Sequence, residues 1–399
     1  MLLPPLAAPR RPSPPSYVSS NTKPRGLDGV VAAQTRLSHV DGQAGELIIG
    51  GYQLRELAGR VSFEEAAHLL WRGALPSRDE LAGLRREIAA LRALPDEAMH
   101  VVRAAAKSPP IDALRMACAT LSLDLPHPDD ISPAADLRAA KLLTARFPTI
   151  VAAHARLSAG REPIPPRTDL PLAANFLYMV HGKEPDPIAA RAIDAYWVTV
   201  IDHGMNASTF TARVIASTRS DMVSAVTGAI GALKGPLHGG APGPVLDMLK
   251  EIRSADRAEA WVRNKLAGGR RIMGFGHRVY KVRDPRADVL STVANEIGTA
   301  GGGALENRKL FDLARAAEQT ILKVLDEVKP GRNLRTNVEF FTALVLQALG
   351  LEPRSFVATF ACARVAGWCA HVLEQHREDH LIRPQSEYIG PRGLKIGGD

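Results

Sequence analysis

The stretch Gly235-Pro236-Leu237-His238-Gly239-Gly240 is the feature from which the rest of the chain is interpreted. It places a histidine between a Gly-Pro turn and two glycines. Proline fixes one φ angle, whereas glycine admits backbone conformations that are closed to other residues. Because Gly239 and Gly240 carry no side chain, a ligand could approach the His238 imidazole closely. The stretch therefore predicts a turn that presents His238 to a small molecule.

Two stretches further along the chain have a similar character. The first is Gly274-Phe275-Gly276-His277-Arg278-Val279-Tyr280, which continues to Asp284-Pro285-Arg286, and the second is Asn337-Val338-Glu339-Phe340-Phe341. An apolar setting such as that of Glu339 raises the pKa of a carboxylate and suits a general base, although it suits a buried ion-pair partner equally well. Two loop histidines, an arginine and an acid together indicate carbon-acid chemistry on an anionic substrate.

Other charged residues are weaker candidates. His203 follows Asp202 at the end of a helical pattern, where a hydrogen-bonded helix-end histidine is the plainer interpretation. Arginines present planar forks that match carboxylates, and Arg286, Arg364 and Arg383 are candidates for this role, although most arginines are surface residues. No metal is predicted, because His371, His376 and His380 are spaced around a helix and no zinc-ligand spacing is present.

Length and composition limit the class of protein. The chain has 399 residues, with 46% hydrophobic and 23% charged residues, which is enough for two domains. No apolar run reaches the roughly 18 residues that span a membrane. The net charge is +8, and Arg10, Arg11, Lys23 and Arg25 contribute +4 of it within the first 25 residues. Because the remaining excess is spread along the chain, a nucleic-acid groove is disfavoured, whereas a small anionic substrate needs only a few local arginines.

The cysteines and the N-terminal residues indicate in which cellular compartment the protein is expected. The three cysteines, Cys118, Cys362 and Cys369, form no C-x-x-C pair, and their odd number argues against a disulfide framework. A reducing cytoplasm is the simplest compartment. Residues 1–25 are rich in proline and lack a sustained apolar core, so we interpret them as a disordered tail rather than a signal peptide.

Periodicity predicts an all-α fold with a minor hairpin. The hairpin is expected where Val40-Asp41-Gly42 and Gly50-Gly51 flank a short apolar run. Ser62 and Ser77 each precede a glutamate by three residues, which is the capping-box signature of a helix start. Helical spacing is strong after Pro187 and again near the C-terminus. Residues 158–170 are expected to form a surface connection, and Gly301-Gly302-Gly303 a flexible surface loop.

The ordered motifs of residues 26–392 resemble the citrate synthase family in its shorter bacterial form. Motifs specific to that family are matched by Met205-Asn206-Ala207-Ser208-Thr209-Phe210-Thr211-Ala212-Arg213, by Gly235–Ala241 and by Gly274–Tyr280. Gly26–Ala32 and Gly51-Tyr52 resemble the family's opening segments. The resemblance implies a homodimer of mostly helical subunits. It also implies a large domain (26–236 and 351–399) and a small domain (237–350) that close over a shared cleft.

Carried over by position, the resemblance implies roles for individual residues. His238 matches the histidine that hydrogen-bonds the acetyl thioester oxygen, His277 the one that polarises the oxaloacetate carbonyl, and Glu339 the base that removes the methyl proton. The family's ligands of oxaloacetate and citrate are matched by His203, Asn206, Arg286 and Arg364. Its basic contact to coenzyme A is matched by Lys281, and its arginine that reaches into the partner's site is matched by Arg383. The substrates would be acetyl-CoA and oxaloacetate, with no cofactor.

One position departs from the family pattern. The family's base is an aspartate, whereas this chain has Glu339, which keeps the carboxylate and adds a methylene. A displacement near 1 Å can cost about 100-fold in rate when it misplaces a catalytic group. The activity that the resemblance implies is that of a citrate synthase, which condenses acetyl-CoA with oxaloacetate and water to give citrate and CoA. The alternatives are a 2-methylcitrate synthase acting on propionyl-CoA and a catalytically weakened relative that binds citrate or CoA as a sensor. One methylene in an acyl pocket is worth only about 1–3 kcal/mol of discrimination.

Overall fold

The computed structural model describes residues 25–27, 29–239, 242–299 and 304–395. Contacts divide the chain into two units, Met1–Gln34 and Thr35–Asp399. The tail predicted at residues 1–25 lies outside the described residues except for Arg25, which begins the 3-10 turn η1 (Arg25–Leu27). The glycine loop predicted at 301–303 also lies outside them. Everything below concerns the second unit.

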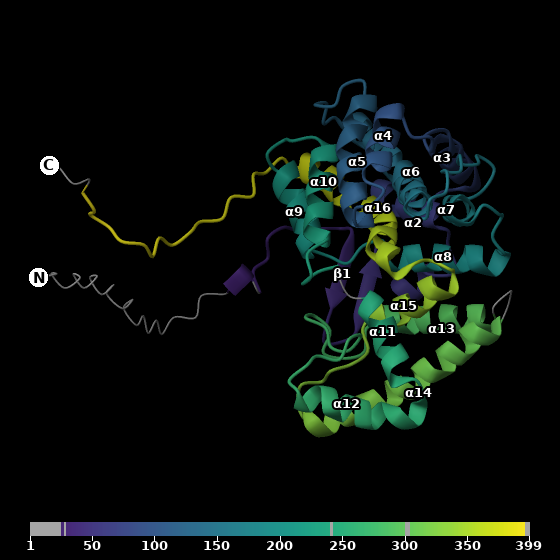
Figure 1. Cartoon of the computed structure of the whole chain (residues 1–399). Coiled ribbons are helices and arrows are strands. Elements are labelled where there is room, and N and C mark those ends of the chain that lie inside the picture. Colours follow the sequence, from purple (N-terminus) through teal and green to yellow (C-terminus); the bar gives the residue numbers. More distant parts are fainter. Residues whose placement is uncertain (1–24, 28, 240–241, 300–303, 396–399) are drawn as a thin grey trace, which may run out of the picture. The chain divides into compact units, whose positions relative to one another are not determined.

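Helices dominate this unit, which confirms the predicted fold class (Figure 1). Three short 3-10 turns, η2 (Leu121–Asp124), η3 (Ala255–Arg257) and η4 (Pro353–Ser355), join some of them. The α-helices in chain order are α1 (Leu54–Leu57), α2 (Phe63–Arg72), α3 (Arg78–Ala90), α4 (Asp96–Ala104), α5 (Pro110–Thr120), α6 (Pro133–Ser158), α7 (Leu172–His181), α8 (Pro187–Val200), α9 (Ala207–Ala216), α10 (Met222–Leu233), α11 (Pro242–Ile252), α12 (Ala258–Ala267), α13 (Pro285–Thr299), α14 (Ala304–Val328), α15 (Val338–Ala348) and α16 (Phe356–Glu378).

The predicted hairpin is present and gains a third strand. Strands β1 (Ser38–Asp41), β2 (Glu46–Ile49) and β3 (Tyr52–Gln53) pair antiparallel in sequence order. Ser38 faces Ile49 in the register of β1 with β2. Along β2 the burial alternates, so that Leu47 and Ile49 enter the core, as expected for a strand with one buried face. This core contact anchors the hairpin to the helices.

Helix starts follow the capping signals in the sequence. Ser62 and Ser77 both form complete capping boxes, with Glu65 and Glu80 respectively. Each pair satisfies two backbone N–H groups that a helix start would otherwise leave without partners. Gly73 ends α2 with φ 84°, a left-handed conformation that favours glycine. The predicted helices after Pro187 and near the C-terminus are confirmed as α8 and α16, and residues 159–171 connect α6 to α7.

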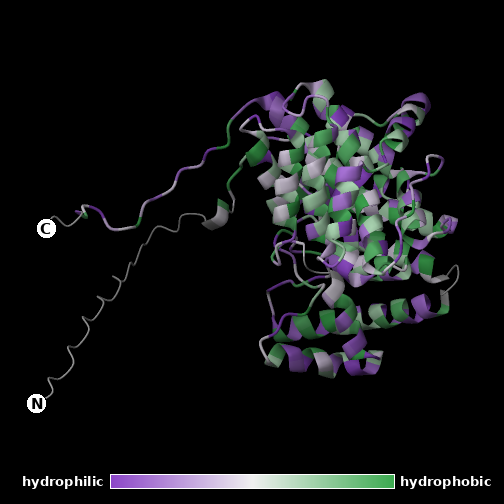
Figure 2. Cartoon of the chain, turned by 45° about the horizontal axis from the view of Figure 1, so that its top comes forward, coloured by the Kyte–Doolittle hydropathy of each residue, from purple (hydrophilic) through white to green (hydrophobic). Residues whose placement is uncertain are grey.

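Helix α16 runs through the hydrophobic core. It contacts α2, α6, α8, α9 and α10. Pro353–Glu378 is long and apolar enough to cross a membrane by length and composition, but 89% of its most apolar window is buried inside the protein, as in the core helix of a globular fold. Cys362 and Cys369 are both buried on this helix. Hydrophobic residues (green in Figure 2) are concentrated within the packed helices.

A second group of helices packs around α13, α14 and α15. Helix α13 contacts both α14 and α15, and α11 and α12 complete the group. Helix α8 belongs to the first group of helices, those packed around α16, and it contacts α13 and α15 of the second group. In Figure 1 the first group lies in the upper part of the view and the second group in the lower part. These groupings resemble the predicted large and small domains, but contacts join all of Thr35–Asp399 into one unit. The domain boundaries at 236/237 and 350/351 stay a prediction.

Candidate active site

His238 is held against the first turn of α9. Its Nε2 accepts a hydrogen bond from the Ser208 backbone N–H at 3.3 Å and lies 2.8 Å from Ser208 Oγ. Because Nε2 is an acceptor, the neutral ring carries its proton on Nδ1, for which no partner occurs among the described residues. Burial, with a smaller effect of Arg364, lowers the pKa of His238 to about 4. At neutral pH the imidazole therefore offers an uncharged Nδ1–H donor.

The glycine after His238 is also required for packing. A Cβ on Gly239 would collide with the Leu233 carbonyl oxygen and lie 3.2 Å from the carbonyl carbon. The predicted turn is confirmed, because the backbone N–H groups of His238 and Gly239 both donate to the carbonyl of Gly235. The chain itself therefore comes close to Gly239, and Gly240 lies outside the described residues. Approach of a ligand to the His238 ring stays a prediction.

His277 is oriented by its own loop. Its Nδ1 accepts the backbone N–H groups of Val279 at 3.0 Å and Tyr280 at 3.1 Å. The neutral ring must therefore carry its proton on Nε2, and burial, followed by the nearby Arg286, lowers the pKa of His277 to about 4. Arg286 Nη2 lies 3.3 Å from His277 Nε2, so two N–H donors lie side by side. No acceptor of the described chain lies between them. Such a pair suits a carbonyl or carboxylate oxygen of a ligand.

Arg286 is fixed by Asp284, two residues earlier. Its Nε and Nη2 donate to the two Asp284 carboxylate oxygens at 3.0 and 2.7 Å. Burial opposes the charge of Arg286, but the influence of Asp284 outweighs it and raises the pKa of the guanidinium. Asp284 Oδ2 also accepts the backbone N–H of Val338 at 3.2 Å, which ties this loop to the start of α15.

Glu339 lies in the first turn of α15. Asn337 caps that helix by accepting the Glu339 backbone N–H at 3.1 Å, and its own amide donates to Gly276 O at 2.9 Å, beside His277. The Glu339 carboxylate has no hydrogen bond within the described part of the chain. Burial raises its pKa to about 7, because the attraction of Arg286 only partly offsets desolvation. The predicted rise in pKa is confirmed, whereas its role as base stays a prediction.

His203 and Arg364 enter from the first group of helices. His203 follows α8, and its Nε2 lies 3.1 Å from the Tyr280 hydroxyl, with its ring centroid 5.6 Å from that of His277. Burial, and then Arg286 and Arg364, lower the pKa of His203 well below its ordinary value. Arg364 on α16 donates through Nε to Val200 O at 2.7 Å and stacks over Phe360 at 4.5 Å. Burial lowers its pKa to about 10.

The other predicted site residues differ in how closely they join this cluster. Asn206 caps α9, and its Oδ1 accepts a hydrogen bond from Ser208 Oγ at 2.8 Å, so it supports the residue that holds His238. Lys281 is exposed on the His277 loop and donates through Nζ to Arg278 O at 3.3 Å. Arg383 is exposed in the segment after α16, which extends away from the helices (Figure 1), and the structure does not bring it to the histidines of its own chain.

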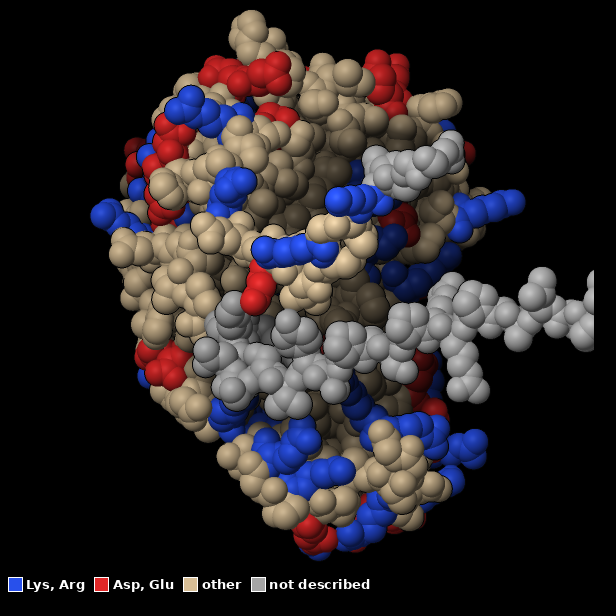
Figure 3. Space-filling view, turned by 90° about the vertical axis from the view of Figure 1, so that its left-hand side faces the viewer, with Lys and Arg blue, Asp and Glu red and all other residues tan. Residues whose placement is uncertain are grey.

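Basic side chains gather beside the His277 loop. Figure 3 shows lysine and arginine concentrated on the lower part of that face, around α12, α14 and the loops that follow them. Exposed basic residues in these segments are Arg270, Arg271, Arg278, Lys281, Lys329 and Arg332. This surface suits an anionic ligand that reaches the site from outside.

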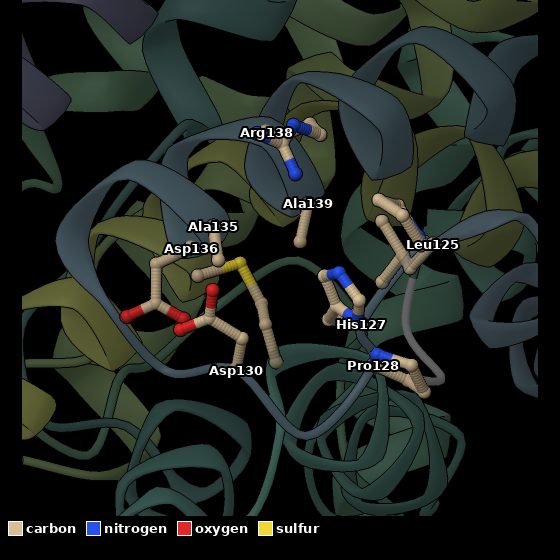
Figure 4. Close-up of a pocket in the computed structure, with 10 residues that line it drawn as sticks. Leu125, His127, Pro128, Asp130, Ala135, Asp136, Arg138 and Ala139 are labelled. Atoms are coloured by element: carbon tan, nitrogen blue, oxygen red, sulfur yellow. The ribbon is translucent and has the colours of Figure 1, made fainter.

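A small pocket elsewhere is not part of this site. It is lined by the loop before α6 and the first turns of that helix, including His127, Asp130, Asp136 and Arg138 (Figure 4). None of the clustered histidines or Glu339 lines it, and Asp136 is already paired with His376 at 2.7 Å. Within the described ranges, no group of three or more His, Cys, Asp or Glu residues is arranged to hold a metal ion.

Sequence reasoning missed several supporting residues. Ser208, which holds His238 and also accepts from Trp368 Nε1 at 3.1 Å, lies in a motif that was used only for Asn206. Tyr280 and Asp284 lie in quoted motifs but had no role assigned to them. The only sequence signal for these three residues is that they lie inside the motifs. Their partners depend on contacts between segments far apart in the chain, which the spacing of residues in the sequence does not reveal.

Comparisons with known proteins agree with this geometry. Residues 26–385 match the family model described as "Citrate synthase, C-terminal domain". The chain belongs to the citrate synthase family. A protein named citrate synthase from Haloferax volcanii is 40% identical over 376 residues, covering 93% of this chain and 96% of that relative. The crystal structure of a Thermoplasma acidophilum citrate synthase in a ternary complex with carboxymethyl coenzyme A and oxaloacetate superposes with a TM-score of 0.85 at 28% identity, covering 93% and 98% of the two chains.

A relative whose name includes 2-methylcitrate synthase is almost as similar in sequence. A Bacillus subtilis protein named citrate/2-methylcitrate synthase is 37% identical and covers 92% of this chain and 96% of its own length. This identity is only slightly below that of the Haloferax citrate synthase. Citrate synthase family membership therefore leaves the acyl group open.

Proposed function

We propose that this chain condenses acetyl-CoA with oxaloacetate and water to give citrate and CoA, as an acyltransferase of the citrate synthase type. The observation that carries the proposal is the combination of two uncharged imidazole donors with one unpaired, partly buried carboxylate. His238 offers Nδ1–H and His277 offers Nε2–H, while Glu339 has a pKa of about 7. A base near neutral pKa and donors aimed at developing oxyanions are the groups that enolisation of a thioester needs.

The proton and bond changes follow from these groups. The Glu339 carboxylate takes a proton from the acetyl methyl group, and His238 Nδ1–H stabilises the developing enolate oxygen. The enol carbon then forms a bond to the ketone carbon of oxaloacetate. His277 Nε2–H and Arg286 stabilise the resulting alkoxide, which takes a proton from solvent, while Glu339 returns the methyl proton to solvent and becomes a carboxylate again. Water finally cleaves the citryl thioester and releases CoA and citrate. The reaction uses two substrates and needs no cofactor.

Substrate binding divides between the two groups of helices. His203, Arg286 and Arg364 would hold the carboxylates and ketone of oxaloacetate, with Asn206 supporting the His238 side. Lys281 and the neighbouring basic residues would meet the phosphates of coenzyme A. Because these groups come from elements on both sides of the cluster, we propose that oxaloacetate binds first and closes the large and small domains. Compaction by small-angle scattering with oxaloacetate alone is the expected result, and tight acetyl-CoA binding without oxaloacetate would contradict ordered binding.

We also propose a homodimer in which Arg383 serves the neighbouring site. Its support is the exposed position of Arg383 on a segment that leaves its own helical body. Inactive Arg383→Ala and His277→Ala chains should complement when mixed, because one site of the heterodimer then receives both defects and the other receives neither. Activity should recover toward half of one wild-type dimer. No recovery, with heterodimers confirmed by mass spectrometry, would remove Arg383 from the partner's site.

The acyl group is tested by turnover. In a thiol-release assay with oxaloacetate we expect a higher kcat/KM with acetyl-CoA than with propionyl-CoA. The reverse ratio would make the chain a 2-methylcitrate synthase, and no release with either would favour the citrate or CoA sensor. We also propose a role in the tricarboxylic acid cycle, which the proposed activity supports, and a cytoplasmic location, which the three free, buried cysteines support.

A further inference from the structure

We infer that the β1–β2 hairpin is a brace that positions two substrate loops, the one carrying His203 and the one carrying His277. This inference rests on the proposed function, because it assigns positioning residues to the same site. The residues that carry it are Ser38 at the start of β1 and Gly42 in the turn that follows β1. Both lie in a segment that carries none of the predicted site residues.

Ser38 holds the residues on both sides of His203. Its hydroxyl donates to the Asp202 carboxylate and accepts the backbone N–H of Gly204 at 2.9 Å. Val40, on the same strand, packs there as well, since its Cγ2 lies 3.4 Å from the position that a Cβ on Gly204 would take. One serine side chain therefore holds the side chain of the residue before His203 and the backbone N–H of the residue after it.

Gly42 holds the loop of His277 in a comparable way. Its carbonyl accepts the backbone N–H of Lys281 at 2.8 Å. A Cβ on Gly42 would collide with the Val279 carbonyl oxygen and lie 2.7 Å from its carbonyl carbon. Gly42 does not have a left-handed φ, so the site excludes a side chain because of space and not because of backbone conformation. The backbone N–H groups of Val279 and Tyr280 are the ones that His277 Nδ1 accepts.

The hairpin joins these two contacts through a short, supported strand. Ser38 and Gly42 are four residues apart, about 13 Å in an extended strand. β1 pairs with β2 along its whole length, and Leu47 and Ile49 anchor β2 in the core. Across the site the rings of His203 and His277 lie 5.6 Å apart. A shift at either end of the hairpin would therefore change the spacing of two groups that both contact oxaloacetate in the proposed mechanism.

The test uses Gly42→Ala, Ser38→Ala and the double variant of the full chain. Each single change should lower kcat/KM for oxaloacetate by about 10- to 100-fold, the range that follows from displacing catalytic groups by a fraction of an ångström to 1 Å. The double variant should lose less than the product of the two single losses, because both changes break the same brace. Ser38→Thr keeps the hydroxyl and should restore most of the activity. Gly83→Ala is the matched control, because a Cβ there meets nothing within 4 Å.

Hydrogen exchange provides a readout that does not depend on catalysis. In the wild-type chain the amides of Lys281 and Gly204 should be protected. Gly42→Ala should expose the first and Ser38→Ala the second, and each should also speed exchange at the other end of the hairpin. If the proposed activity fails, the wild-type chain shows no turnover while this exchange pattern still tests the brace.

The brace is overturned if folded variants keep kcat/KM within twofold of wild type, or if their losses simply multiply. Exchange that rises only at the substituted end overturns it as well. If Gly42→Ala does not fold, the activities of Ser38→Ala and Ser38→Thr are compared instead. Equal activity of those two variants then counts against the brace.

Discussion

Asp202, which is buried beside His203, and Glu339, which is partly buried, are two acids with opposite surroundings. Asp202, after α8, accepts hydrogen bonds from Ser38 Oγ and from His371 Nε2 at 3.2 Å. Burial disfavours its charge, but His371, Arg364 and Ser38 together outweigh burial, and the pKa of Asp202 is lowered. Glu339, in the first turn of α15, lacks such donors to its carboxylate in the described part of the chain, and its pKa is raised to about 7.

The difference separates an acid that holds structure from one that can exchange protons. A carboxylate saturated with donors stays ionised and fixes its neighbours, whereas a buried carboxylate without donors can gain and lose a proton near neutral pH. His371 itself accepts from Arg213 Nη1 at 3.1 Å, so its proton lies on Nε2 and is directed at Asp202. The contrast predicts that changes at Glu339 act on rate and that changes at Asp202 act on stability.

The largest expected effect is that of Glu339→Gln on turnover. Glutamine keeps the size of the side chain but cannot accept the methyl proton, and loss of a positioned base costs about 10²- to 10⁴-fold in rate. The dissociation constant for oxaloacetate should change little, because its proposed ligands are histidines and arginines. Glu318→Gln is a useful control. This buried carboxylate on α14 accepts from Arg315 at 2.8 Å and Thr336 at 2.6 Å and should affect stability more than proton transfer.

A smaller loss is expected for Glu339→Asp. The backbone at residue 339 cannot move forward to replace the missing methylene, because Asn337 and Asp284 hold the first two N–H groups of α15. In addition, Phe340 packs against Gly274, where a Cβ would lie 2.8 Å from Phe340 Cδ2. We expect kcat to fall about 10- to 100-fold, as for a base displaced by roughly 1 Å. An increase in kcat would mean that glutamate is a handicap in a site shaped for aspartate.

The smallest effect on catalysis should accompany Asp202→Asn, because the side-chain oxygen of asparagine can still accept the Ser38 hydroxyl and the main loss is in folding stability. Hydrogen bonds to a buried charge each contribute about 1.5–3 kcal/mol, so we expect the free energy of unfolding to fall by roughly 2 kcal/mol in urea titrations. Because the pKa of Asp202 is lowered, its contribution is present above about pH 4 and is lost as pH falls below that value. The difference in the free energy of unfolding between the wild type and the variant should therefore become smaller in acid. Asp312→Asn, which breaks an exposed pair with Arg308, should cost less than about 1 kcal/mol, and an equal loss there would contradict the distinction.

The sequence predicted the fold class and most of the site because both depend on local patterns. Capping boxes, helical spacing and the glycine-flanked histidines are each contained within a few residues. The raised pKa of Glu339 was expected from its two neighbouring phenylalanines. These signals indicated which residues matter but not how they are held.

What could not be predicted depends on contacts between distant segments. The proton of His238 is assigned by Ser208, 30 residues away, and that of His371 by Arg213, 158 residues away. The role of Gly42 depends on Val279, which no periodicity connects to it. Gly239 is a further case, because the close contact of Leu233 with this glycine is not visible in the local sequence pattern.

The most direct test of Glu339 as an unpaired base is exchange of the acetyl-CoA methyl protons with deuterium. The measurement uses an unreactive dicarboxylate in place of oxaloacetate, so that no carbon–carbon bond forms. Exchange by the wild-type chain should rise with pH through about 7, because the pKa of Glu339 is raised to that value and the deprotonated form is the active one. In Glu339→Gln the exchange rate should fall at least about 100-fold across the same range. Exchange in Glu339→Gln at the wild-type rate, with the same dependence on pH, would contradict the account and leave Glu339 as a structural acid.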